Sequence, residues 1–103
     1  METRKIFDTN VAFEKQEGLI TIFTVIEYPP ASNKNFEILF PEAMDYTTAL
    51  KITETLRKKG KPLGAIDILI AAMSMNRSLT VTTKDKDFLL IKEALPEFKV
   101  EII

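Results

Sequence analysis

The sequence of 103 residues contains no histidine and no cysteine. Without cysteine the chain can form no disulfide, no thiolate nucleophile and no zinc–thiolate site. Without histidine it can form neither a Ser-His-Asp triad nor an imidazole acid–base pair. Any metal that binds must therefore be held by oxygen atoms. The sequence also lacks a run long and apolar enough to span a bilayer, and its opening, METRKIFD, lacks the apolar region of a signal peptide. We therefore expect a cytoplasmic protein that does not insert into membranes.

The remaining composition is that of a small globular protein. Hydrophobic residues make up 46% of the chain, enough to build a core without disulfides, and the length predicts a single domain over residues 1–103. The formal net charge of -1 says little about partners. Charge distribution says more, because acidic residues interrupt apolar runs whereas basic residues concentrate in RKKGK, residues 57–61.

Short apolar runs alternate with helical patterns along the chain. This alternation favours βαβ units and a mostly parallel sheet, although the strand order cannot be predicted from it. On the face of the helix expected at 41–59, we predict Tyr46, Ala49, Leu50, Thr53 and Leu56. The expected strands are 6–7, 19–26, 36–40, 78–83 and 99–103, and the expected helices are 10–17, 41–59, 67–75 and 85–94.

Five carboxylates lie where an apolar run meets a turn or a helix start. They are Asp8, Glu27, Asp67, Asp85 and Asp87. In open α/β folds, ligands bind outside the carboxyl ends of the parallel strands, so acids collected there would form one negatively charged hollow. Hard divalent cations such as Mg²⁺ prefer oxygen ligands. The pattern therefore favours metal-assisted chemistry on phosphate groups.

Each of these acids also has a structural explanation. A helix N-cap accounts for Asp8 at least as well as a site does, and an exposed strand end accounts for Glu27. A charged turn that opens a helix explains Asp85 and Asp87, which could alternatively share a cation while Thr83 holds one of them. A helix cap under a loop could explain Asp67, but this acid lies among apolar residues, and ionised aspartate is rarely buried without a partner.

Two further groups of residues have alternative interpretations. In RKKGK, the basic residues complement the dipole at the end of a helix. Lys59 and Lys61 could instead contact the phosphate backbone of a nucleic acid. Met73, Met75 and the phenylalanines are predicted to belong to the core rather than to a binding surface.

The ordered set of motifs resembles the PIN-domain family, whose best-known members are VapC-like toxins of toxin–antitoxin pairs. The matching segments are Ile6–Val11 (IFDTNV), Glu27 after the second apolar run, Gly64–Ala72 (GAIDILIAA) and Val81–Phe88 (VTTKDKDF). The resemblance covers essentially the whole chain. Two departures stand out: only short segments separate Asp8, Glu27 and Phe36, and Glu27 is followed by Tyr28-Pro29-Pro30, where the family commonly starts a helix.

The resemblance implies a three-layer α/β/α sandwich around a mostly parallel sheet and a Mg²⁺- or Mn²⁺-dependent ribonuclease activity. It implies Asp8, Asp67 and Asp85 as primary metal ligands, with Glu27 and Asp87 assisting directly or through water, and with Asn10 and Thr83 supporting the acids. An antitoxin protein would be the partner, and we also expect a homodimer, because small domains of this class often pair. The alternatives are a catalytically inactive PIN-like binding or scaffold module, and a processing nuclease that is not a toxin.

Overall fold

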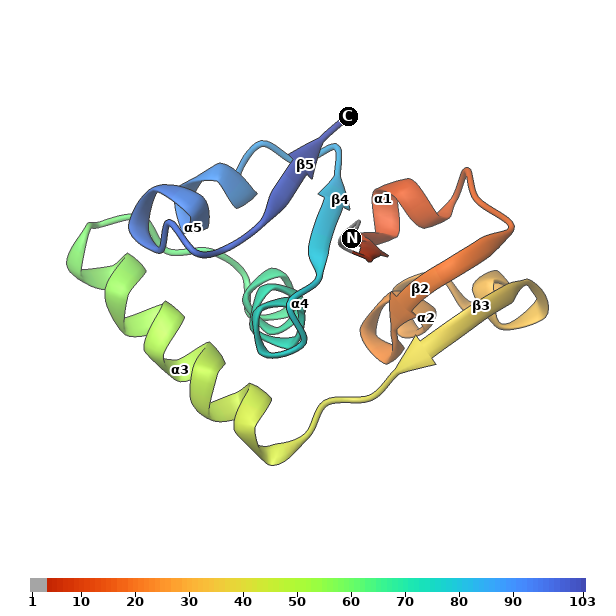
Figure 1. The fold of residues 1–103 in the computed structure, drawn as a ribbon, viewed down its shortest axis with the longest axis horizontal. Coiled ribbons are helices and arrows are strands. Elements are labelled where there is room, and N and C mark those ends of the chain that lie inside the picture. The colour runs from red at the N-terminus through yellow and green to blue at the C-terminus, as the bar shows by residue number, and fades with distance from the viewer. Residues whose placement is uncertain (1–3) are drawn as a thin grey trace.

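The computed structural model describes residues 4–103, and every strand pair in this part of the chain is parallel. Three strands form one sheet in the order β1–β4–β5, and two strands form the pair β2–β3 (Figure 1). The expected α/β fold with parallel strands is confirmed. The strands are β1 (Lys5–Phe7), β2 (Glu17–Thr21), β3 (Asn35–Leu39), β4 (Thr80–Thr83) and β5 (Val100–Ile102).

Five α-helices and one 3₁₀-helix connect these strands within residues 4–103. In Figure 1 the longer helices α3, α4 and α5 lie on one side of β4 and β5, whereas α1, α2 and the β2–β3 pair lie on the other side. The helices are α1 (Thr9–Ala12), α2 (Ile22–Glu27), η1 (Pro29–Asn33), α3 (Ala43–Lys58), α4 (Ala65–Asn76) and α5 (Phe88–Ala94).

The register of β1 and β4 aligns their carboxyl ends. Phe7 lies opposite Thr82, and the N–H of Asp8 donates to the carbonyl of Thr82 at 3.0 Å. Asp8 and Thr83 are therefore neighbours at the same edge of the sheet, as expected for parallel strands.

Gly18 allows β2 to approach β1 closely. Its φ angle is +137°, and a Cβ atom there would lie 2.4 Å from Cε2 of Phe7. Because no side chain fits this space and few residues adopt this backbone conformation, glycine is required here. The segment with α1 and β2 is thereby held against the central sheet.

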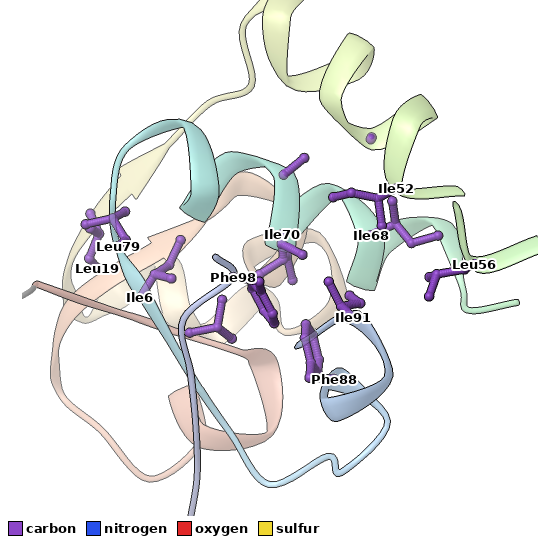
Figure 2. Close-up of a cluster of buried hydrophobic side chains, with 14 residues drawn as sticks. Ile6, Leu19, Ile52, Leu56, Ile68, Ile70, Leu79, Phe88, Ile91 and Phe98 are labelled. Carbon is purple, nitrogen blue, oxygen red and sulfur yellow. The ribbon is translucent and has the colours of Figure 1, made fainter. Parts of the chain in front are cut away.

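The main core lies between the sheet and helices α3 to α5 (Figure 2). Ile6, Ile70 and Val81 are fully buried there, and the rings of Phe88 and Phe98 stack with centroids 6.3 Å apart. Burial of such side chains stabilises the fold by about 1.5–3 kcal/mol each. A smaller cluster under β2 and β3 is built on three buried residues, Ala12, Ile20 and Ala31.

Not every apolar side chain is buried as predicted. Met73 is fully buried, but Phe13 and Phe40 are 52% and 62% exposed, so the assignment of all phenylalanines to the core was wrong. The apolar face predicted for the helix at 41–59 also differs from the face that is buried in the structure. Tyr46 and Leu50 are exposed, and Asp45 and Ile52 are buried in their place.

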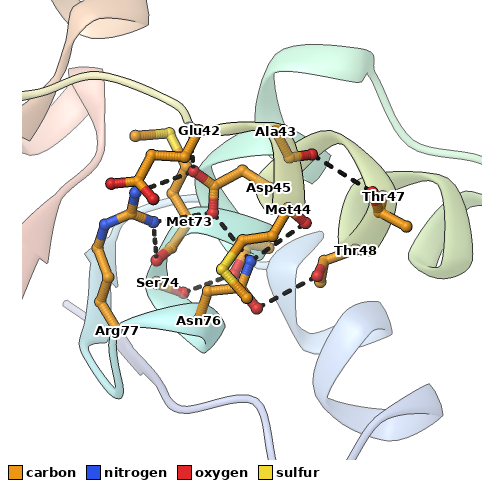
Figure 3. A network of polar contacts seen from close by, with 11 residues as sticks. Glu42, Ala43, Met44, Asp45, Thr47, Thr48, Met73, Ser74, Asn76 and Arg77 are labelled. Atoms are coloured by element: carbon orange, nitrogen blue, oxygen red, sulfur yellow. Dashed lines mark hydrogen bonds and ion pairs between the residues drawn. The ribbon is translucent and has the colours of Figure 1, made fainter.

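Asp45 is buried because it is fully paired. Its two carboxylate oxygens accept hydrogen bonds from both terminal nitrogens of Arg77 at 2.9 Å each (Figure 3). The side-chain amide of Asn76 donates to Oδ1 at 2.9 Å, and the backbone N–H of Glu42 donates to Oδ2 at 2.7 Å. This pair, which we call the Asp45–Arg77 clamp, joins the start of α3 to the end of α4.

The first half of the chain differs most from the sequence predictions. The helix expected at 10–17 is the four-residue α1, because the segment from Glu17 onwards pairs with β3. The strand expected at 19–26 ends at Thr21, whose hydroxyl accepts from the N–H of Thr24 at 3.3 Å and starts α2. Local capping therefore outweighs the β-propensity of this apolar run. After α2 the chain forms the 3₁₀-helix η1, which begins at Pro29.

The second half follows the predictions with shifted boundaries. The helix expected at 67–75 is α4, and the last two strands are β4 and β5. The helix expected at 85–94 begins at Phe88, because residues 84–87 form a turn. Within residues 4–103, no helix has the length and apolar character needed to cross a membrane. The expectation that the opening segment is no signal peptide falls partly on residues 1–3, outside the described residues.

Candidate functional site

Asp8 stands at the carboxyl end of β1 and has both carboxylate oxygens bonded. Oδ1 accepts from the N–H of Thr9 at 2.8 Å, which makes Asp8 the N-cap of α1. Oδ2 accepts from the hydroxyl of Thr83 at 2.8 Å and from the side-chain amide of Asn10 at 3.2 Å. The two interpretations of Asp8 are therefore compatible, because one carboxylate both caps the helix and lies at the sheet edge.

Asn10 and Thr83 tie the β4 turn to Asp8. The Asn10 side-chain oxygen accepts from the N–H of Lys84 at 3.1 Å, and the Thr83 hydroxyl accepts from the N–H of Asp85 at 3.0 Å. The expected hydroxyl hydrogen bond of Thr83 therefore reaches Asp85 through its backbone N–H, while the hydroxyl proton is donated to the carboxylate of Asp8.

Asp85 caps the turn that opens α5. Its Oδ1 accepts from the N–H of Asp87 at 2.9 Å, so the structural explanation for this acid is correct. Its second oxygen has no described hydrogen bond, and the Asp87 side chain is exposed. The side chains of both acids therefore have oxygens that no described hydrogen bond holds in place.

Glu27 ends a helix rather than a strand. It is the last residue of α2, and its Oε1 accepts from the hydroxyl of Thr9 at 2.8 Å. The same Thr9 hydroxyl lies 3.1 Å from that of Thr24, which is fully buried. Sequence reasoning missed Thr9 and Thr24. The spacing of three between Thr24 and Glu27 was the available signal, but it is informative only once residues 22–27 are recognised as helical.

Asp67 lies in the first turn of α4, where the helix dipole favours an acidic side chain. It is half-buried. One and two turns further along the helix, the small side chains of Ala71 and Ser74 are fully buried. The N-terminus of α4 thus brings Asp67 to the edge from a distant part of the sequence.

The electrostatics show that the five acids share one region. Burial is the main cause that raises the pKa of Asp67 to about 6, and the carboxylates of Asp8, Asp85, Glu27 and Asp87 add to the increase. Burial also raises the pKa of Asp8, against the hydrogen bonds from Thr83 and Thr9, and Glu27 and Asp85 raise it further. We call this group of five carboxylates the acidic edge.

Within residues 4–103, no basic side chain forms an ion pair with the acidic edge. Among residues 4–103, the ion pairs involve other acids, namely Glu37, Glu101, Glu93, Asp45 and Glu14. The acidic edge therefore carries mutually repelling charges with no basic side chain to offset them, an arrangement that favours capture of a cation or a proton.

The donor chemistry fits a hard divalent cation, because every side-chain donor is oxygen. In the described part of the chain, however, no three acidic side chains converge closely enough to hold a metal ion. Asp8 is fixed by its hydrogen bonds, whereas Asp67, Asp87 and the free oxygen of Asp85 are not. The acids that could bind a metal are thus gathered, and the adjustable ones would have to move towards Asp8.

The predicted RNA-contacting lysines lie elsewhere. Lys59 is the C-cap of α3, and the Lys61 ammonium is 3.7 Å from a carboxylate oxygen of Glu93 on α5. No described interaction joins either lysine to the acidic edge. Lys84 is nearer, because it stands between Thr83 and Asp85 and forms an ion pair with Glu14.

Comparison with known proteins establishes the fold. No family model and no curated protein matches the sequence. Among solved structures, VapBC-1 from nontypeable Haemophilus influenzae matches with a TM-score of 0.75 and 16% identity over 95% of this chain and 96% of that chain. DNA-bound VapBC from Salmonella typhimurium matches with a TM-score of 0.73 and 19% identity over 98% of both chains.

A third match is VapBC-5 from Mycobacterium tuberculosis, a member of the VapBC family of toxin–antitoxin systems. Its TM-score is 0.72, with 20% identity over 99% of this chain and 98% of that chain. The mostly parallel α/β fold therefore matches the PIN-like fold found in VapBC structures over nearly the whole length of both chains.

Proposed function

We propose that this protein is a metal-dependent endoribonuclease that hydrolyses RNA phosphodiester bonds, and that it acts as the toxin of a toxin–antitoxin pair. The observation that supports the activity is the acidic edge: five electrostatically coupled carboxylates from four separate segments, with no ion-pair partner in the described part of the chain. The carboxyl edge of a parallel sheet is also where α/β folds bind ligands.

The proposed cofactor is Mg²⁺ or Mn²⁺. Asp8, Asp67, Asp85 and Asp87 would hold it, and Glu27 would act at the same site directly or through water. When bound, such an ion lowers the pKa of a coordinated water and offsets negative charge on the phosphate. Because the ion supplies the activated water, a catalytic site without histidine is chemically sufficient.

The side chains of the site would orient one another and bind the cation. Asp8 is preoriented by Thr9, Asn10 and Thr83, so it provides a fixed oxygen around which the other acids adjust. Thr9 directs the carboxylate of Glu27 towards the same edge. Asp67 binds a cation readily, since burial and neighbouring charge make its own negative charge costly.

The toxin role and the partners are supported by the fold alone. The matched structures contain VapBC complexes, and one of them is a named member of the toxin–antitoxin family. An antitoxin protein and a second copy of this chain are therefore the proposed protein partners. A small gene for an antitoxin immediately upstream would support the toxin role; a processing nuclease would not need one.

A catalytically inactive PIN-like binding module is the second candidate. It is favoured by the absence, among residues 4–103, of three acids already close enough to hold a metal. The two candidates differ in cation binding. A module without a metal site would show neither calorimetric heat nor a shift in melting temperature at millimolar Mn²⁺ or Mg²⁺.

The decisive experiment is incubation of the protein with mixed RNA and Mn²⁺, with and without EDTA. We expect cleavage that EDTA abolishes and that Asp8→Asn and Asp67→Asn each reduce by at least about 100-fold, an effect of about 2.7 kcal/mol. Glu97→Gln, which alters an exposed acid distant in sequence from the site residues, is the matched control. Cleavage by Asp67→Asn at the rate of the control would refute the assignment.

A further inference from the structure

An exposed aromatic ring follows α1, the short helix whose N-cap is Asp8. Phe13 follows α1 directly, and 52% of its surface is exposed. Its ring packs edge-to-face on Tyr28, with centroids 4.5 Å apart and an angle of 76° between the planes. Tyr28 is only half-buried itself and follows Glu27 directly in the sequence. Two aromatic side chains therefore meet beside the ends of the two helices that carry Asp8 and Glu27.

The pair is held rigidly, and only one ring is free. The Lys34 ammonium lies 5.1 Å from the centroid of the Tyr28 ring. It also donates to the backbone carbonyls of Phe13 at 3.3 Å and Lys15 at 3.0 Å. Lys34 thus pins the turn after α1 and packs on Tyr28, which leaves Phe13 as the ring that is open to solvent.

Two lysines are tied to the segment that carries Phe13: Lys15 lies two residues after it, and Lys84 pairs with Glu14, the next residue. Lys15 is exposed, with its ammonium 5.6 Å from the centroid of the Phe7 ring. Lys84 forms its ion pair with Glu14, and the two side chains are 42% and 56% exposed. An exposed pair of this kind contributes little to stability, so a phosphate group could take the place of Glu14 at low cost.

We propose that Phe13 is a stacking platform for a base of single-stranded RNA, supported by Tyr28 and Lys34, with Lys15 and Lys84 contacting the adjacent phosphates. A free aromatic ring beside lysines is the combination that single-strand binding surfaces use. The placement also suits the chemistry, because Thr9 and Glu27 join the same two helices at 2.8 Å. A strand stacked on Phe13 would reach the acidic edge along α1.

The proposed ligand is single-stranded because only an unstacked base exposes a face to a protein ring. The proposal deepens the function proposed above by naming the form of RNA that the site accepts. It replaces Lys59 and Lys61 as the principal contacts, since those lysines belong to the far end of α3.

The test measures binding without cleavage. A fluorescein-labelled single-stranded RNA of about ten nucleotides is titrated with Asp67→Asn protein in EDTA, and anisotropy gives the Kd. On this background Phe13→Ala should weaken binding about fivefold or more, the lower end of the effect of removing one stacked base. Phe40→Ala is the matched control, because Phe40 is a similarly exposed phenylalanine that follows β3.

Two further variants separate stacking from charge. Phe13→Trp should retain binding, and its fluorescence, the only tryptophan signal in the chain, should be quenched by the stacked base. Lys15→Gln and Lys84→Gln should each reduce the slope of log K against log salt by about 0.7, as expected for one phosphate contact on a single strand. Lys51→Gln, which alters an exposed lysine of α3, should leave that slope unchanged.

The outcomes are decisive in both directions. Equal affinities of Phe13→Ala and Phe40→Ala for the single-stranded RNA would overturn the platform. The platform would also be overturned if Phe13→Ala weakened binding of duplex RNA as much as it weakened binding of single-stranded RNA. Binding that depends on Phe13 in a protein that never cleaves RNA with Mn²⁺ would uphold the platform and refute the nuclease. RNA cleavage by a protein whose RNA binding does not depend on Phe13 would uphold the nuclease and refute the platform.

Discussion

The fully buried Asp45 and the half-buried Asp67 have pKa values shifted in opposite directions. Burial alone would raise the pKa of Asp45, but hydrogen bonds from Arg77, the Glu42 N–H and Asn76 outweigh it and lower the pKa to about 2. Asp67 has no such partners, and burial with neighbouring carboxylates raises its pKa to about 6. The same side chain is stabilised as an anion between α3 and α4, and destabilised as an anion at the start of α4.

The difference separates a structural acid from a candidate functional one. The Asp45–Arg77 clamp satisfies its charge within the fold and needs nothing from outside. The acidic edge leaves charge uncompensated, which costs stability and is typical of sites that bind a cation or transfer a proton. Four changes test whether the two aspartates differ in this way. They are given in decreasing order of their expected effect on the free energy of unfolding.

Breaking the clamp should have the largest effect. Arg77→Met leaves the fully buried Asp45 without its cationic partner, and we expect a loss of about 3 kcal/mol, because an uncompensated buried charge is costly. Urea denaturation at pH 7 measures it. Arg57→Met, at an exposed position of α3, is the control.

A double variant identifies the cause of that loss. Asp45→Leu combined with Arg77→Met removes both charges, and it should recover most of the stability that the single variant loses. If the double variant were no more stable than Arg77→Met, packing of the arginine rather than its charge would hold α3 and α4 together.

A divalent cation should act on the acidic edge alone. At a Mn²⁺ concentration ten times its Kd, mass action predicts a stabilisation of about 1.4 kcal/mol, visible as a higher melting temperature. Arg77→Met should show the same increase, since the clamp takes no part in binding. An increase that persists undiminished in Asp67→Asn would place the cation elsewhere.

Removing the charge of Asp67 should stabilise the protein while it removes activity. Because the folded-state pKa is raised, the folded protein holds more protons than the unfolded chain between pH 3.8 and about 6, and stability falls as pH rises through that window. Asp67→Asn should therefore gain about 1 kcal/mol at pH 7, after discounting for solvent around this half-buried side chain.

The pH dependence of that gain is its internal check. The difference in unfolding free energy between Asp67→Asn and the unaltered protein should be small near pH 4 and grow up to about pH 6. The contribution of Asp45 to stability changes with pH in the opposite direction. Because its pKa is lowered, it stabilises the fold above pH 3.8, and this stabilisation is lost as the pH falls towards 2. A gain that did not change with pH would show that Asp67 is not destabilised by its charge.

The second half of the fold was largely predictable from the sequence, and the first half was not. Helix α4 and strand β4 carry strong, uniform patterns, so Asp67 and Asp85 were placed at the correct element ends. Residues 19–26 are mostly apolar and β-branched, and period alone cannot distinguish a buried strand from a short helix. The boundary is set at Thr21, the last residue of β2, whose hydroxyl caps α2.

The sequence also could not predict which polar side chains pair with one another. The burial of Asp45 could not be foreseen, because Arg77 lies 32 residues further along the chain. For the same reason the sequence did not identify Asp8 as a second partner of the Thr83 hydroxyl, because the two residues are 75 positions apart. Local spacing identifies the types of residue that gather at a sheet edge, whereas the pairing among them depends on the strand order β1–β4.

The smallest effect on stability is expected from the side chain of Thr9, whose hydroxyl donates to Glu27 of the acidic edge. Thr9→Val keeps the shape of the side chain and removes the hydrogen bonds to Thr24 and Glu27, at a cost of about 0.5 kcal/mol. If Glu27 contributes to the reaction, RNA cleavage should fall about tenfold, as is typical when a group that orients a metal ligand is lost. Thr9→Ser retains the hydroxyl and should restore the rate. An unchanged rate in Thr9→Val would exclude Glu27 from the site and reduce the acidic edge to its four aspartates.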